Sequence, residues 1–152
     1  MFREELAALF HRDLKKVSLQ IKAFGDAAQL WETVPGVTNS AGNLILHLEG
    51  NLREYVGRQL GGITYVRDRP LEFSSRSTPA EELLQRMEGV TEMVPAVIKS
   101  LELAQLAATF PENVLGAAMS TQYFLIHLHG HLNYHLGQID YLRRILCKGR
   151  AL

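Results

Sequence analysis

Apolar residues recur at helical spacing in four segments of the chain. In the first segment they fall at steps of three and four over residues 6–21, a stripe typical of an amphipathic helix. A second helix is predicted after Asn39 or Ser40, because either side chain can cap a helix N-terminus. Gly61 and Gly62 are predicted to end this second helix.

The third predicted helix has a defined start in the segment TPAEELL. Thr78 is expected to be its N-cap, Pro79 its first helical residue, and Glu81 the partner that completes a capping box. The apolar stripe then continues past Pro95, and a proline inside a helix is expected to kink it.

The fourth helix is predicted from about Ser120 to Cys147, which gives four long helices and no convincing strand. This pattern predicts an all-α fold, a four-helix bundle, as a single domain over residues 1–152. Residues 61–77 are polar, contain a proline and are expected to form a long ordered loop. That loop is longer than a simple up-and-down bundle needs, so we expect a crossover connection.

The composition restricts the possible partners and the compartment. Sixteen basic residues balance sixteen acidic ones, so there is no electrostatic argument for nucleic-acid binding. Cys147 is the single cysteine, which excludes an intramolecular disulfide and favours a reducing compartment. No signal peptide and no apolar run of about 18 residues is evident, so we expect a cytoplasmic protein without a membrane span.

Four of the six histidines lie between residues 127 and 135. His131 and His135 are four residues apart, as are His127 and His131, and residues at this spacing share one face of a helix. His127 and His135 are about 12 Å apart along the axis, so only one of the two pairs can serve one ion. His129 points away from His131 and is expected to face solvent.

His47 is the candidate for a third ligand, because a catalytic metal site usually takes three protein ligands and keeps one position open. It lies in an apolar helix, and Asn43 and Asn51 flank it at steps of four. This polar stripe suggests an internal cavity. The alternative is that His47 is a hydrogen-bonded packing residue and the histidine pair a chance feature of a polar helix face.

Two segments, NSAGNLILHLEGNLREYVGRQLGG and HLHGHLNYHLGQIDYLRRIL, resemble the signature helices of the DinB-like superfamily of bacterial metal-binding helical bundles. That group includes proteins described as metal-dependent hydrolases and the bacillithiol and mycothiol S-transferases. The likeness is sharpest in HLNYHLGQ, where the Gly-Gln after the second histidine selects the pair His131 and His135. The resemblance implies that these two residues and His47 hold one divalent ion, nickel or zinc, completed by water or substrate, in a homodimer.

Three neutral imidazoles leave a bound ion its full charge, which favours an anionic further ligand and lowers the pKa of bound water or thiol. A zinc protease would carry a glutamate directly after the first histidine, but this position is Leu132. Glu54 is interpreted as a surface acid. We therefore expect thiol transfer ahead of hydrolysis, with a non-catalytic, stress-associated metal bundle as the third alternative. Gln138 and Tyr134 are candidates for orienting ligands or lining a pocket, and no catalytic side chain is assigned.

Overall fold

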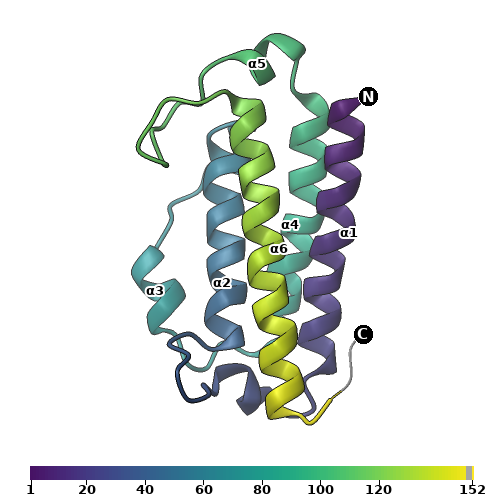
Figure 1. Ribbon diagram of the computed structural model, residues 1–152, viewed down its shortest axis with the longest axis vertical. Helices are drawn as coiled ribbons and strands as arrows, with labels where there is room; N and C mark the ends of the chain where they lie inside the picture. The colour runs from purple at the N-terminus through teal and green to yellow at the C-terminus, as the bar shows by residue number, and fades with distance from the viewer. Residues whose placement is uncertain (150–151) are drawn as a thin grey trace.

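The computed structural model describes residues 1–149 and 152. Four long helices dominate it, with shorter helices in the connections (Figure 1). The long helices are α1 (Phe2–Ala23), α2 (Ala41–Leu52), α4 (Ala80–Ser100) and α6 (Thr121–Leu146). The shorter elements are the 3-10 helix η1 (Ala27–Trp31), the π-helix η2 (Arg53–Arg58), α3 (Arg69–Ser74) and α5 (Leu103–Ala107).

The described residues contain no β-strand, only an isolated bridge between Thr109 and Ser120, so the predicted all-helical class is confirmed. α1 contacts α4 and α6, and α2 contacts the same two helices. α1 and α6 run in one direction and α2 and α4 in the other (Figure 1). None of the described helices combines the length and apolarity required to cross a bilayer.

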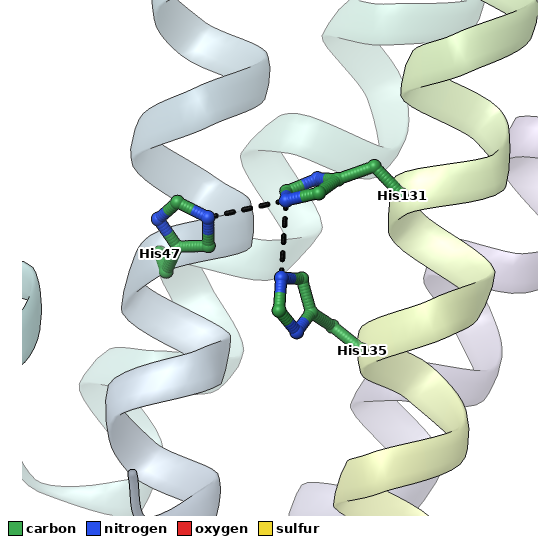
Figure 2. A group of neighbouring side chains, drawn as sticks. All are labelled: His47, His131 and His135. Carbon is green, nitrogen blue, oxygen red and sulfur yellow. Dashed lines mark hydrogen bonds between the residues drawn. The ribbon is translucent and has the colours of Figure 1, made fainter. Parts of the chain in front are cut away.

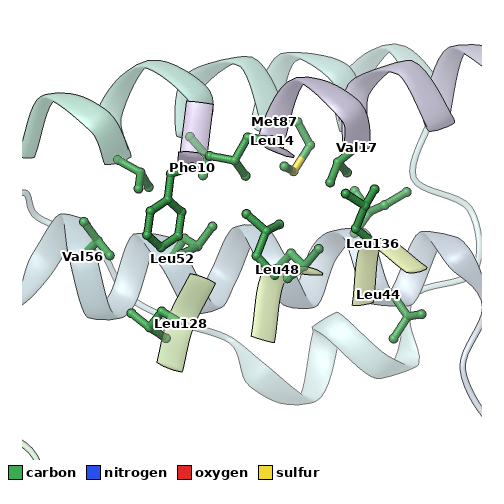
Figure 3. Close-up of a cluster of buried hydrophobic side chains, with 14 of the residues drawn as sticks. Phe10, Leu14, Val17, Leu44, Leu48, Leu52, Val56, Met87, Leu128 and Leu136 are labelled. Carbon is green, nitrogen blue, oxygen red and sulfur yellow. The ribbon is translucent and has the colours of Figure 1, made fainter. Parts of the chain in front are cut away.

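The core lies between the four long helices, and each helix contributes one apolar face to it. The apolar residues that form the predicted stripe of α1 are all buried, and Figure 3 shows three of them in the core; they are Leu6, Phe10, Leu14, Val17 and Ile21. Leu48 of α2, Met87 of α4 and Leu128 of α6 meet it in the same cluster. Burying a side chain of this size contributes about 1.5–3 kcal/mol, so these contacts fix the register of the helices that carry the site.

α2 is buried along its whole length, and its start is defined by a capping box. The Ser40 hydroxyl accepts a hydrogen bond from the Asn43 amide at 3.2 Å, and the Asn43 side chain accepts one from the Ser40 amide at 3.4 Å. The predicted cap at Ser40 is therefore confirmed. The helical path continues beyond α2 as the π-helix η2 and turns at Gly62, whose φ of +65° suits glycine.

The start of α4 differs from the prediction by one residue. Pro79 has a ψ of 144° and is the N-cap, so the helix begins at Ala80. Thr78 does not cap it; its hydroxyl instead lies 3.0 Å from that of Ser75. Pro95 lies inside α4 as expected, whereas the kink predicted there stays a prediction.

The segment predicted as a loop at residues 61–77 contains a helix, so this prediction was wrong. Asp68 caps α3 by accepting a hydrogen bond from the Leu71 amide at 3.0 Å, and Pro70 occupies the first turn. α3 packs on the outer side of α2, where Figure 1 shows the segment descending toward the start of α4. This path brings α3 next to the middle of α2.

Candidate metal centre

Three histidines from two helices meet on one side of the bundle. His47 comes from the middle of α2, and His131 and His135 lie one turn apart on α6 (Figure 2). The Nε2 atom of His131 is 3.2 Å from Nε2 of His47 and 3.0 Å from Nε2 of His135. All three ligand atoms lie within 4.8 Å of one another. The structure therefore brings together the three residues that the sequence selected.

Two of these imidazoles are oriented by oxygen atoms behind them. His47 Nδ1 is 2.9 Å from Oε2 of Glu72, and His135 Nδ1 is 2.7 Å from Oε1 of Gln138. A carboxylate or amide oxygen accepts, so both Nδ1 atoms donate, and each ring in this tautomer has its Nε2 lone pair on the side of His131. Outer partners of this kind are typical of metal-bound histidines. The donor set therefore suits a divalent metal ion.

The protonation of the pair on α6 favours metal ligation. Burial, with a smaller contribution from the neighbouring His135 and His47, lowers the pKa of His131 to about 3. Burial also lowers the pKa of His135, although its hydrogen bond with Gln138 opposes this. Both rings are therefore neutral at pH 7, which is the form that binds metals. His131 Nδ1 is buried and has no hydrogen-bond partner in the described part of the chain.

Glu72 and Arg67 are members of the site that the sequence analysis missed. Glu72 is only 5% exposed and accepts hydrogen bonds from Arg67 Nε at 2.6 Å and Arg67 Nη2 at 2.9 Å. Burial raises the pKa of Glu72, but the hydrogen bonds with His47 and Arg67 outweigh it and hold the pKa below the usual value. A charged carboxylate therefore stands behind His47.

Gly50 makes the approach of Glu72 to α2 possible. A Cβ atom at this position would lie 2.2 Å from Oε1 of Glu72, well inside van der Waals contact. The glycine stands three residues after His47 in a fully buried helix, where glycine is otherwise unfavourable. This was the signal in the sequence that a neighbouring group approaches the backbone here.

The other candidate residues have different environments. Gln138 contacts His135 as described, and the Tyr134 ring lies edge-on to His135 with 5.3 Å between centroids. Asn43 donates to the carbonyl groups of Glu72 and Ser75, both at 3.0 Å, and so connects α2 to α3 rather than lying in the histidine group. The Oδ1 atom of Asn51 is buried without a partner in the described part of the chain.

The two remaining histidines of the cluster lie outside the metal-ligand group. His127 is exposed and stacks on Phe124 at 5.9 Å. His129 was expected to face solvent, and this was wrong. Its side chain is only 19% exposed, and its Nε2 lies 3.0 Å from Oδ2 of the buried Asp13 on α1. The rotation that takes His129 away from His131 directs it into the contact between α1 and α6.

The fold and the histidine group define an all-helical protein with a candidate metal centre between two of its long helices. The model of the DinB superfamily matches residues 9–139, and the chain belongs to this superfamily. No functionally curated protein matches it.

Two solved structures share the fold. A conserved protein from Enterococcus faecalis has 13% identity and a TM-score of 0.72, over 97% of this chain and 96% of that one. A DinB-like protein from Bacillus cereus has 18% identity and a TM-score of 0.66, over 88% of this chain and 85% of that one. At these identities the likeness concerns the fold alone.

Proposed function

We propose that this chain is a metal-dependent enzyme in which His47, His131 and His135 hold one divalent ion, nickel or zinc. The observation that supports the proposal is the convergence of three Nε2 atoms from two helices, two of them on rings whose outer nitrogen is fixed by Glu72 or Gln138. Imidazole ligands suit both metals.

A bound ion of this kind lowers the pKa of a thiol or of water, and so supplies a nucleophile at neutral pH. The reaction that we favour is transfer of a low-molecular-weight thiol to a small electrophile. The thiol gives its proton to solvent, its sulfur forms a bond to an electrophilic carbon, and the leaving group departs with the electron pair of the broken bond. In this scheme Glu72 and Gln138 keep two of the imidazoles in the orientation that binding requires.

The surroundings of the site favour thiol transfer over hydrolysis, because in the described part of the chain no unpaired carboxylate lies beside the three histidines to act as a general base. Leu132 occupies the position where a zinc protease carries its glutamate. Both oxygens of Glu72 are engaged by His47 and Arg67. Glu54 is ion-paired with Arg58 and lies outside the histidine group. There are two alternatives to the transferase: a metal-dependent hydrolase and a non-catalytic metal-binding bundle.

We also propose, from the superfamily resemblance, that the protein is a cytoplasmic homodimer acting on a small molecule. Light scattering coupled to size-exclusion chromatography measures the mass of the particle directly. A mass of twice the 17.1 kDa chain is expected, and a mass of one chain at micromolar concentration would contradict the dimer.

The metal centre is tested by elemental analysis of tag-free protein purified without chelator or metal-affinity resin. We expect close to one equivalent of metal in the wild type, loss of the metal in His47→Ala, and retention in His127→Ala. His127 is the matched control because it is an exposed histidine of the same cluster. A wild type that takes up neither zinc nor nickel on reconstitution would refute the site.

The reaction is tested with the metal-loaded wild type. Loss of a thiol such as cysteine or glutathione in the presence of an alkyl halide is followed over time, with the His47→Ala protein as the blank. Metal-dependent thiol consumption supports the transferase. Cleavage of an ester or amide without thiol consumption would favour the hydrolase. If neither reaction occurs and removal of the metal lowers the melting temperature strongly, the metal would have a structural role.

A further inference from the structure

A cavity of about 510 Å³ lies beside the candidate metal centre. Its walls come from the segment at residues 34–39, from the start of α2 and from the second half of α6. His135 and Gln138 form part of the wall, so the cavity extends up to the histidine group. The volume falls in the range of about 300–1,000 Å³ that is usual for small-molecule sites.

Among the residues that the structure describes, no lysine, arginine, aspartate or glutamate lines this cavity. The charged residues of this part of α6, Asp140, Arg143 and Arg144, do not line it. Asp140 is paired with both arginines, and the Arg144 guanidinium lies over the ring of Tyr141, 5.3 Å from its centroid. A charged ligand placed against the wall would therefore lose part of its hydration without gaining a counter-charge from the residues that line it, which is unfavourable. The apolar part of the wall includes Val37, Leu44, Tyr141 and Ile145.

We propose that this cavity binds an uncharged ligand with a substantial aromatic or aliphatic part. The inference deepens the proposed function, on which it rests for the reaction itself, because it assigns the electrophilic substrate to the class of neutral apolar molecules. The thiol would approach the metal centre, and the carbon skeleton of the second substrate would occupy the apolar wall next to His135.

The charge preference is tested with two fluorescent probes of nearly the same shape. N-phenyl-1-naphthylamine is neutral, whereas 8-anilinonaphthalene-1-sulfonate carries the same ring system with one negative charge. Each is titrated into metal-free and zinc-loaded protein. We expect the neutral probe to bind at least tenfold more tightly than the anionic one to the metal-free form, in which the cavity wall alone determines the preference. Bound zinc is expected to reduce this difference, because its charge favours an anion next to His135.

The location is tested with one substitution at two positions of α6. Ile145→Glu places a carboxylate in the cavity wall, whereas Ile126→Glu places it elsewhere on the same helix. The two isoleucines are 58% and 50% exposed, so both variants are expected to fold, and circular dichroism checks this. Val37→Asp provides a second variant on the opposite wall.

We expect Ile145→Glu and Val37→Asp to weaken binding of the neutral probe at least tenfold and Ile126→Glu to change it less than twofold. No binding of the neutral probe, equal binding of the anionic probe, or equal effects of the two isoleucine substitutions would overturn the proposal. The titration is also made with metal-free protein, so it tests the cavity independently of the metal. Failure of the metal site is detected separately, by elemental analysis.

Discussion

Glu72 Oε2 accepts a hydrogen bond from His47 Nδ1 at 2.9 Å, although the two residues are 25 positions apart in the chain. Arg67 holds the carboxylate from its other side. A carboxylate behind an imidazole fixes the tautomer that directs Nε2 toward a metal and increases the basicity of that nitrogen. We therefore regard Glu72 as a positioning residue for the proposed centre.

Glu72→Gln is expected to reduce metal affinity by about 10- to 100-fold, the usual cost of losing such an outer partner. The amide keeps the shape of the side chain but not its charge. Competition with a chromophoric zinc chelator measures the affinity. Glu54→Gln is the matched control, because Glu54 is also paired with an arginine but lies outside the histidine group. Equal affinities of the two variants would contradict the role of Glu72.

Gly50→Ala is expected to weaken zinc binding as well, because the new Cβ atom would displace the Glu72 carboxylate from α2. The displaced atom, Oε1, is the far end of a side chain, but the hydrogen bonds that Arg67 donates to both oxygens of this carboxylate make its displacement unfavourable. Thermal unfolding and the same zinc competition report the effect.

Gly130→Ala is the control for this substitution, since a Cβ atom at Gly130 on α6 would meet nothing within 4 Å. Alanine there is expected to stabilise the helix by up to about 1 kcal/mol through its higher propensity, without any effect on metal. Unchanged zinc affinity in Gly50→Ala would show that the close approach of Glu72 has no influence on the site.

The three histidines could be predicted because the relevant information is local. The four-residue step between His131 and His135 places them on one helix face, and the Gly-Gln that follows selected this pair through the family resemblance. His47 was found as a polar residue in an apolar helix. The four long helices were likewise predicted from apolar residues at helical spacing, and these residues form the core of the structure.

The contact of Arg67 and Glu72 with His47 could not be predicted, because it depends on the path of the connection between α2 and α4. Helical periodicity does not encode this path, and the segment that contains Arg67 and Glu72 was interpreted as a loop. Local signals for α3 were present, since Asp68 precedes Pro70 as a cap precedes a first-turn proline. Gly50 was the second signal, but neither one identifies the partner that approaches.

The metal-free protein is expected to lose stability as the pH falls from about 6.5 toward 3. His131 has a pKa of about 3 in the folded chain and about 6.5 when exposed, so the unfolded chain binds a proton in this range that the folded chain does not. Stability from this group is complete above pH 6.5 and decreases below it.

Urea denaturation of chelator-treated protein at pH 7.5, 6 and 5 measures this loss. His131→Leu removes the titrating ring and is expected to lose less stability than the wild type over the same interval. Other groups that titrate in this pH range change the stability of both proteins, so the difference between the two pH profiles reports the contribution of His131. Parallel pH profiles would show that His131 is not held neutral by its surroundings.

The contact between Asp13 and His129 is expected to stabilise the fold without affecting the metal centre. Asp13 is fully buried on α1, and it also accepts a hydrogen bond from Asn133 at 3.1 Å and pairs with Arg12 and Lys16. These partners compensate the negative charge of Asp13 in the contact between α1 and α6. Hydrogen bonds to a charged group contribute about 1.5–3 kcal/mol to the free energy of unfolding.

Asp13→Asn should therefore lower the free energy of unfolding by about 2 kcal/mol, since an amide accepts fewer of these bonds and carries no charge. His129→Ala should lower it less, because the ring is one of several partners of Asp13. Chemical denaturation measures both values, and elemental analysis should find the metal content unchanged in each variant. Loss of metal in His129→Ala, at a temperature where the variant is folded, would mean that this histidine belongs to the centre after all. Retention of the metal in His129→Ala would show that the histidines of α6 have two roles. His131 and His135, on the face toward α2, would be ligands, and His129, on the face toward α1, would be structural.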